Sequence, residues 1–191
     1  MKKLILLLLL TPLFSFCQIK VEMENFTILY SEEKEQPLKV EYQVMCNNED
    51  ITFSRSGMNF YKCDSIKTSD DADYYKNIWD KGHMVPAADF NCNEKALRST
   101  FTYLNCALQH QELNRGTWKY LEDYERKLAD TSIVKVKIDI LFEENSKRLQ
   151  TGAVVPEGFR KTIWLNDELF GIWYFPNKPA KERNVNIYRL K

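Results

Sequence analysis

Residues 80–90 (DKGHMVPAADF) contain His83, one of only two histidines in the chain. Gly82 precedes this histidine, and Pro86 follows it three residues later. Because glycine permits backbone conformations that other residues avoid and proline fixes φ, the segment predicts a turn that directs the imidazole at a target. Imidazole changes its charge near neutral pH, so His83 is the first candidate for a general base. A lone histidine is more often structural, so a catalytic interpretation needs partners elsewhere in the chain.

A second group of polar residues lies farther along the chain. Asn114 opens the sequence NRGTWKYLE, and Glu122 closes it. Asparagine offers an amide oxygen, a ligand type that Mg²⁺ accepts while it keeps several waters. On a straight helix, eight residues rise about 12 Å and turn the two side chains about 80° apart, so they cannot readily ligate one ion together. Glu122 would then act through metal-bound water.

Each of these residues also has a structural explanation. Asn114 is typical of a helix N-cap, and Glu122 is typical of a solvated helix face. Trp118 is better explained as a core residue than as a base-stacking platform. Asp80 is expected to be a buried hydrogen-bond partner that shapes the histidine segment, and His110 a surface loop residue without a role. Only the joint pattern of residues favours catalysis.

The order and spacing of the motifs resemble those of a known family. Residues 80–83 read Asp-Lys-Gly-His, Asn105 is followed by Gln109, and residues 114–122 follow. This series is similar to the DNA/RNA non-specific endonucleases, which carry Asp-Arg-Gly-His, then Asn-x-x-Pro-Gln, then Asn-x-Gly-x-Trp-x-x-Leu-Glu. The resemblance extends over residues 55–161.

The resemblance implies both a fold and an activity. The fold is α+β, the ββα-metal nuclease fold, with a mostly antiparallel central sheet and helices packed on it. The activity is hydrolysis of phosphodiester bonds in DNA and RNA with Mg²⁺, for which Mn²⁺ can substitute, and it leaves 5′-phosphate ends. Contact with the sugar–phosphate backbone rather than with base edges implies little sequence specificity.

The resemblance also assigns roles to individual residues. His83 would be the general base that activates water. Asn114 would be the single direct protein ligand of the metal, and Glu122 would hold metal-bound waters. Arg55, in a segment similar to the family's Arg-x-x-x-x-Phe, would bind the scissile phosphate. Asn105 would orient the histidine segment from behind.

Two positions depart from the family pattern. Lys81 stands where the signature has arginine, which keeps the charge but loses the two-pronged geometry of guanidinium. Leu108 replaces the proline of the second motif. Asp80 and Lys81 are therefore expected to support the site rather than to perform the chemistry.

The net charge counts mildly against a nucleic-acid partner. The chain has 27 basic and 27 acidic residues, whereas nucleic-acid-binding proteins usually show a basic excess. Two alternatives therefore stay open: a catalytically silent nucleic-acid-binding module on the same fold, and a disulfide-held secreted interaction domain. Loss of His83 or Asn114 would mark the silent module, and both residues are present.

The elements that must position these residues follow from hydrophobic periodicity. Helices are predicted at 93–100, with Asn93 as the N-cap, and at 114–129. Strands are predicted at 26–30, 38–44, 51–53, 101–104, 133–142, 151–155, 160–165 and 170–175. The alternation at 133–142 is the clearest of these patterns.

The first 17 residues resemble a secretory signal. A basic start precedes an apolar stretch that is too short for a comfortable membrane span, and Ser15 and Cys17 are small residues at the positions that determine cleavage. One mature domain, residues 18–191, is expected to be secreted or periplasmic, without stable membrane association. A lipidated Cys17 is the alternative, against which the bulky Phe16 argues. The oligomeric state is not predicted.

Four cysteines remain after the signal, and an even number in an exported protein predicts two disulfides. They are Cys46, Cys63, Cys92 and Cys106. Three pairings stay open, and proximity in sequence favours Cys46–Cys63 with Cys92–Cys106. A zinc site is the alternative, although the chain has no Cys-x-x-Cys or Cys-x-x-His spacing.

Overall fold

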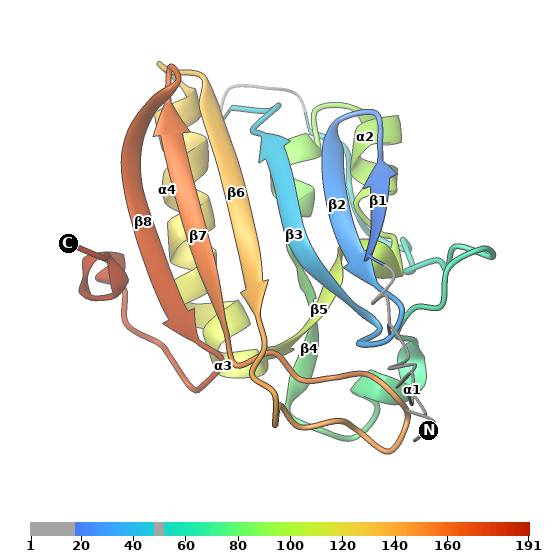
Figure 1. The fold of residues 1–191 in the computed structure, drawn as a ribbon. Coiled ribbons are helices and arrows are strands. Elements are labelled where there is room, and N and C mark those ends of the chain that lie inside the picture. Colours follow the sequence, from blue (N-terminus) through green and yellow to red (C-terminus); the bar gives the residue numbers. More distant parts are fainter. Residues whose placement is uncertain (1–17, 48–51) are drawn as a thin grey trace, which may run out of the picture.

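The structure is a computed structural model that describes residues 18–47 and 52–191. Its main sheet has the strand order β1-β2-β3-β6-β7-β8, and all neighbours are antiparallel (Figure 1). The strands are β1 (Gln18–Glu22), β2 (Phe26–Ser31), β3 (Gln36–Gln43), β6 (Val134–Leu141), β7 (Gly158–Leu165) and β8 (Glu168–Pro176). The predicted signal lies outside the described residues.

Period-two alternation explains how the strands face the core. In β6, Val134, Val136 and Ile138 are buried, whereas Lys135 and Lys137 point away from the core. Successive side chains of a strand point to opposite faces of a sheet, so the buried apolar side chains of β6 all lie on the face that packs against the core. The prediction at 133–142 is confirmed, as are the strands predicted at 26–30, 38–44, 160–165 and 170–175.

Helices cover one face of the main sheet (Figure 1). The longest helix is α4 (Lys119–Ala129), and α2 (Glu94–Ser99) begins at the predicted N-cap Asn93, whose side chain accepts from the Ala96 N–H at 2.9 Å. Trp118, just before α4, is fully buried with its ring centroid 5.5 Å from those of Phe159 and Phe175. The prediction that Trp118 is a core residue is confirmed.

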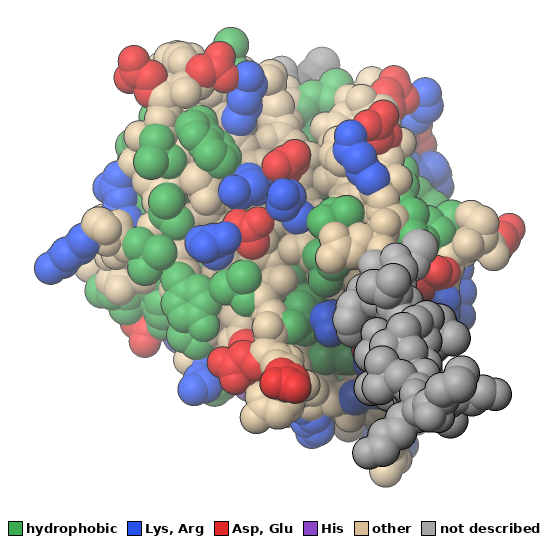
Figure 2. Space-filling model, viewed as in Figure 1, with side chains coloured by type: hydrophobic (Ala, Val, Ile, Leu, Met, Phe, Trp, Pro, Cys, Tyr) green, Lys and Arg blue, Asp and Glu red, His purple; other side chains and the backbone are tan. Residues whose placement is uncertain are grey.

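The opposite face of the main sheet is open to solvent. Figure 2 shows basic and acidic side chains mixed with hydrophobic ones on this face. On β6, Asp139 alternates with the buried Ile138 and Ile140 and forms ion pairs with Arg160, at 3.0 Å, and Lys137, at 3.7 Å. Among the described residues, no helix has the length and apolar character needed to span a membrane.

A separate two-stranded ribbon carries the histidine segment. β4 (Trp79–His83) pairs with β5 (Cys106–His110), and His83 is the last residue of its strand. The predicted turn is therefore displaced: His83 itself lies in a strand, and the chain bends just after it, at Met84 and Val85, before the 3₁₀ turn at 87–90. Gly82 is required for another reason: a Cβ at this position would lie 2.5 Å from Gln109 Oε1. The glycine lets a buried glutamine side chain cross the ribbon.

Several other predicted elements are wrong. Residues 101–104 contain no strand; a 3₁₀ helix, η2 (Tyr103–Asn105), precedes β5 instead. Residues 151–155 form a single bridge between Val154 and Arg148. In the segment predicted as a strand at 51–53, residue 51 lies outside the described part, and 52–53 have no strand structure. Both 101–104 and 151–155 are largely buried, and their backbone bonds go to isolated partners instead of a ladder: the Tyr103 N–H donates to the Tyr61 carbonyl at 3.0 Å and the Val154 N–H to the Lys34 carbonyl at 2.9 Å.

The disulfide also differs from the favoured pairing. Cys46 is bonded to Cys92, with Cα atoms 5.6 Å apart, and Cys63 and Cys106 are free thiols. The Cys46 N–H, just beyond β3, donates to the Asp89 carbonyl at 2.9 Å, which places Cys46 beside Cys92. Among the cysteines that the structure describes, one disulfide is therefore present rather than two; Cys106 is buried in β5 and Cys63 is half-buried.

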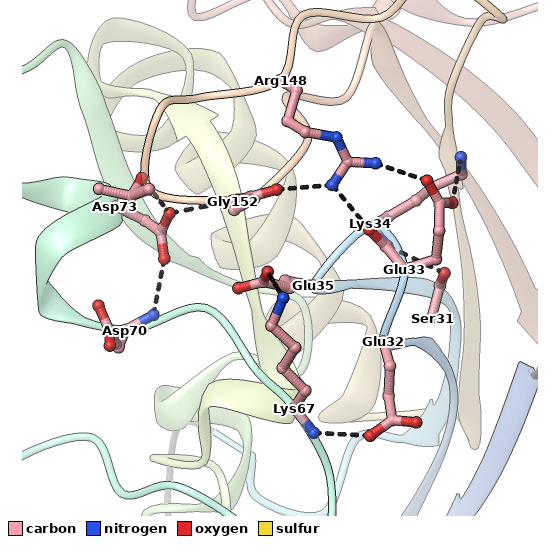
Figure 3. Close-up of polar contacts among 12 residues, drawn as sticks. Ser31, Glu32, Glu33, Lys34, Glu35, Lys67, Asp70, Asp73, Arg148 and Gly152 are labelled. Atoms are coloured by element: carbon pink, nitrogen blue, oxygen red, sulfur yellow. Dashed lines mark hydrogen bonds and ion pairs between the residues drawn. The ribbon is translucent and has the colours of Figure 1, made fainter.

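Polar contacts tie the β2–β3 hairpin to the segment before β7 (Figure 3). Arg148 donates to the Glu33 carbonyl at 2.8 Å and to the Gly152 carbonyl at 2.7 Å. Lys67 forms an ion pair with the buried Glu35 at 2.6 Å. These contacts hold the loop between β6 and β7, which has no regular secondary structure, against the β2–β3 hairpin.

Candidate active site

A cavity of about 670 Å³ lies between the end of β4, the 3₁₀ helix η1 (Ala87–Phe90) and the start of α4. Five of the seven predicted site residues line this cavity: Arg55, Lys81, His83, Asn114 and Glu122. The other two, Asp80 and Asn105, contact its walls from behind. The fold therefore brings together residues that are up to 67 positions apart in the chain.

His83 is held by aromatic rings. Its ring centroid lies 4.7 Å from that of Phe60 and 4.9 Å from that of Phe101. Its buried Nε2 has no hydrogen-bond partner among the described residues. Burial, together with the positive charge of Arg55, lowers the pKa of His83 to about 3. The imidazole is therefore neutral at neutral pH, which is the state a general base requires.

Asn105 supports the histidine segment from behind. Its buried side chain accepts from the Val85 N–H at 2.8 Å and donates to the Val85 carbonyl at 3.0 Å and the Thr100 carbonyl at 2.9 Å. Two of these bonds fix the backbone at Val85, two residues after His83, and the third ties Asn105 to the end of α2 at Thr100. The position is the one that the predicted orienting role requires.

Asp80 sets the orientation of Asn114. The Asn114 Nδ2 donates to Asp80 Oδ2 at 2.9 Å, so the amide oxygen is left free of this bond. Arg115 binds the same carboxylate through two N–H groups, at 2.8 and 2.6 Å. Asp80 therefore holds two consecutive residues at the cavity wall through one carboxylate.

The helix predicted at 114–129 is broken. The short α3 (Gln111–Leu113) leads into a π-helical turn, η3 (Asn114–Trp118), and Gly116 there has non-helical angles of φ −108° and ψ −114°. The straight-helix geometry predicted between Asn114 and Glu122 is therefore wrong, as is the alternative of Asn114 as an N-cap. The break leaves both side chains at one cavity.

His110 is the N-cap of α3 rather than a surface loop residue. It is buried at the end of β5, and its Nδ1 accepts from the Glu112 N–H at 3.2 Å. The prediction that His110 is a surface loop residue is wrong because the sequence pattern predicts no strand at 106–110. Because His110 both ends β5 and caps α3, the chain passes directly from the ribbon into the helical segment that carries Asn114.

Glu122 is bound rather than solvated. Its Oε1 accepts from Trp118 Nε1 at 2.6 Å. Burial raises the pKa of Glu122 to about 7, although the charges of Lys161 and Arg126 oppose the shift. The alternative of a solvated helix face is therefore wrong, and the carboxylate is fixed at the cavity wall.

A buried ion pair lies beneath Trp118. Lys161 and Glu125 are both fully buried, with Nζ and Oε1 2.9 Å apart, and the Tyr42 hydroxyl donates to the other Glu125 oxygen at 2.9 Å. The Lys161 ammonium lies 4.2 Å from the centre of the Trp118 ring. Buried charges are stable only when paired and hydrogen-bonded, so this network fixes the indole that binds Glu122.

Five cations line the cavity, and four of them are paired with carboxylates. The pairs are Lys81–Asp71, Arg115–Asp80, Lys119–Asp123 and Arg126–Asp89. Within the described part of the chain, Arg55 has no carboxylate partner. This cation is therefore the one most available to an anionic ligand.

Sequence reasoning missed Arg126. It lies four residues after Glu122 on α4, and its Nη1 binds the buried Asp89 at 2.7 Å. Residues four apart share a helix face, so the spacing from Glu122 was the available signal. Asp89 carried no signal of its own, because its burial depends on the fold.

A family model described as DNA/RNA non-specific endonuclease matches residues 14–190.

The chain belongs to the DNA/RNA non-specific endonuclease family.

Relatives of this endonuclease-family chain carry the same enzyme class in their names. The mitochondrial nuclease EXOG of Danio rerio is 41% identical over 63 residues, which cover 33% of this chain and 18% of that protein. The mitochondrial endonuclease G of Bos taurus is 36% identical over 81 residues (41% and 27%), and the nuclease of Serratia marcescens 33% over 94 residues (46% and 35%). The matches therefore span about a third or less of each relative's length.

A solved structure shares the fold of this family member. The crystal structure of the EndoG/EndoGI complex aligns with a TM-score of 0.76 and 22% identity, over 90% of this chain and 80% of that one. The predicted fold class, an α+β nuclease fold with an antiparallel sheet, is confirmed.

The donor set of this endonuclease-family site fits a hydrated magnesium ion. Asn114 offers an amide oxygen and Glu122 a carboxylate, and both are oxygen ligands. Among the described residues, no group of three or more His, Cys, Asp or Glu side chains forms a complete metal cage. The residues therefore suit a cation that keeps most of its waters.

Proposed function

We propose that this chain is an exported, Mg²⁺-dependent endonuclease that hydrolyses phosphodiester bonds in DNA and RNA. One observation carries the proposal: a single cavity contains a neutral imidazole, an oriented amide, a fixed carboxylate and an arginine that has no carboxylate partner among residues 18–47 and 52–191. Phosphodiester hydrolysis needs an activated water and positive charge on the phosphate, and these groups can supply both.

Each residue has a defined role in this proposal. His83 accepts a proton from the attacking water, because its imidazole is neutral and its ring packs against that of Phe60. Arg55 binds the scissile phosphate. Asn114 would hold Mg²⁺, with Mn²⁺ as a substitute, and Glu122 would bind water of that ion. When bound, the cation supplies charge that stabilises the phosphate and the leaving oxygen.

Digestion of nucleic acid tests the proposal. Purified protein with its disulfide oxidised is incubated with plasmid DNA and with RNA, in Mg²⁺, in Mn²⁺ and in chelator. Cleavage in either metal and none in chelator supports the proposal. Intact DNA and RNA in both metals contradict it, and a DNA-binding assay then separates a silent nucleic-acid-binding module from a secreted interaction domain.

The export part of the proposal rests on two observations. Residues 1–17 have the composition of a secretory signal, and the Cys46–Cys92 disulfide is typical of oxidising compartments. Cell fractionation with N-terminal sequencing tests it. A mature chain that starts at Gln18 outside the cytoplasm supports export, whereas an uncleaved chain in the cytoplasm contradicts it.

A further inference from the structure

Lys81 is the main departure of this chain from the family signature. It lies on β4 two residues before His83, so both side chains point to the same face of the ribbon, and both line the cavity. A lysine in this position could contact the phosphate or serve the protein itself. Its surroundings distinguish these two roles.

The Lys81 ammonium is enclosed by aromatic rings. Its Nζ lies 5.2 Å from the ring centre of Tyr103, 5.4 Å from that of Phe60 and 5.9 Å from that of Tyr74. These distances are within the range of cation–π attraction. Asp71 forms an ion pair with the ammonium and accepts from the Tyr103 hydroxyl at 2.7 Å. The cation is therefore already satisfied by the protein.

Phe60 connects this enclosure to the proposed base. Its ring centroid lies 4.7 Å from His83, and it also contacts Phe101 at 5.4 Å and Tyr103 at 5.5 Å. Because His83 Nε2 has no hydrogen-bond partner in the described part of the chain, ring packing is a main constraint on the imidazole. A change in the position of Phe60 is therefore transmitted to His83.

We propose that Lys81 is a positioning residue that fixes the His83 imidazole through Phe60, while Arg55 supplies the charge that binds the phosphate. The inference deepens the proposed nuclease function and rests on it. It assigns the two cations opposite roles: one acts on the geometry of the base and the other on the affinity for nucleic acid.

Salt-dependent binding separates the two roles without catalysis. The Kd of wild-type protein for a DNA oligonucleotide is measured in chelator at several salt concentrations. Removal of one phosphate contact lowers the slope of log Kd against log salt by about 0.7–0.9. Arg55→Ala is expected to show this decrease, and Lys81→Met is expected to leave the slope unchanged. A decrease in Lys81→Met overturns the inference.

Steady-state kinetics in Mg²⁺ give the second readout. Lys81→Met is expected to lower kcat about tenfold or more, with KM changed less than twofold, because misplacement of a catalytic group acts on the chemical step. Lys81→Arg keeps the charge and the ring contacts, so it should restore most of kcat. Lys76→Met is the matched control, because Lys76 lies 4.9 Å from the ring of the exposed Tyr75, outside the cavity.

The imidazole itself gives the third readout. The chain has two histidines, so a carbon–proton NMR spectrum shows two sets of ring signals, and His83→Ala identifies one of them. Lys81→Met should shift the His83 signals, whereas Lys81→Arg and Lys76→Met should not. Unmoved His83 signals in Lys81→Met overturn the inference.

The failures of the two proposals are distinguishable. If wild-type protein cleaves no nucleic acid, the proposed function fails, yet the NMR and salt measurements still decide whether Lys81 fixes the imidazole. If wild-type protein cleaves and Lys81→Met raises KM with kcat unchanged, only the positioning role fails. Thermal unfolding of each variant verifies that the fold is retained.

Discussion

Asn105 shows how one buried side chain supports the proposed base. It satisfies the Val85 N–H and two carbonyls, and all of these groups lose their partner in Asn105→Ala. A buried hydrogen bond that is lost with its partner left unsatisfied costs about 1–3 kcal/mol. We predict a loss of about 2–4 kcal/mol in the free energy of unfolding, measured in urea.

Asn93 provides the comparison. Its side chain makes one capping bond at the start of α2, and the loss of such a cap costs about 1 kcal/mol. Asn93→Ala should therefore destabilise less than Asn105→Ala and leave nuclease activity intact. Equal effects of the two substitutions would contradict the supporting role of Asn105.

Asp80 is predicted to act on the metal through Asn114. In Asp80→Ala, the Asn114 amide loses the bond that orients it, and residues that orient a metal ligand typically contribute 10–100-fold to affinity. We expect the Mg²⁺ concentration for half-maximal activity to rise about tenfold or more. Arg115→Ala is the control, because it removes the exposed ion pair but keeps the Asn114–Asp80 bond. An unchanged Mg²⁺ requirement in Asp80→Ala would contradict this role.

Hydrophobic periodicity could not predict the break at Gly116 in the helical segment 111–129. Apolar spacing over 114–129 fits a continuous helix. The interval from Trp118 to Leu121 is the same whether the helix is continuous or broken at Gly116, so it does not reveal the break. The π-helical turn depends on the chain at 180–181, where the Ala180 carbonyl would lie 2.4 Å from a Cβ on Gly116. A contact between segments 64 residues apart leaves no local pattern.

Gly116→Ala tests this contact. The added methyl group cannot fit against a backbone carbonyl, so the turn must move, at a cost of about 1–3 kcal/mol. We predict lower stability and a loss of activity larger than the stability change explains, because Asn114 and Glu122 lie on either side of the break. Gly57→Ala is the comparison outside the helix, where nothing lies within 4 Å and only the positive φ of 78° opposes the change. Wild-type activity in Gly116→Ala would contradict the proposal.

The elements show where sequence reasoning works and where it fails. Alternation located β6 because one face of that strand is buried and the other is not. It failed for β5, because every residue from Cys106 to His110 is buried and no alternation exists. The predicted strand, at 101–104, therefore ends before β5 begins. For the same reason the sequence pattern does not predict that His110 caps α3. Motif spacing still located the site, since those residues are chemically required.

The net charge of the whole molecule does not predict the charges that line the cavity. The chain has equal numbers of acidic and basic residues, which argued against a polyanionic substrate. The structure gathers five cations at one cavity and pairs four of them with carboxylates. Composition averages over the whole surface, so it could not reveal that Arg55 lines the cavity without a carboxylate partner in the described part of the chain.

Thiol chemistry tests the disulfide pattern of the whole molecule. Burial raises the pKa of Cys106 to about 12, so this thiol should not react with iodoacetamide in the folded protein at pH 8. For the mature chain that starts at Gln18 and lacks Cys17, we predict at most one reactive thiol in the folded state, at Cys63, and two after unfolding without reductant. Four thiols without reductant would contradict the Cys46–Cys92 disulfide.

Reduction of that disulfide should destabilise the fold. The bond closes a loop with a sequence separation of 46, for which chain entropy gives about 4 kcal/mol. We expect a lower Tm in reductant, with Cys46→Ser combined with Cys92→Ser showing the same shift without reductant. An unchanged Tm in both cases would contradict a stabilising role of the bond.

The water-activating role of His83 is the part of the proposed function on which the other roles depend. Its most direct test is single-turnover cleavage of a DNA substrate by His83→Ala in Mg²⁺, with DNA affinity measured separately in chelator. General-base catalysis contributes about 10²–10⁴-fold, so we predict a rate at least 100-fold below that of wild type, with DNA affinity and Tm nearly unchanged. A variant that binds DNA normally and keeps most of its cleavage rate would contradict the account and place the base elsewhere.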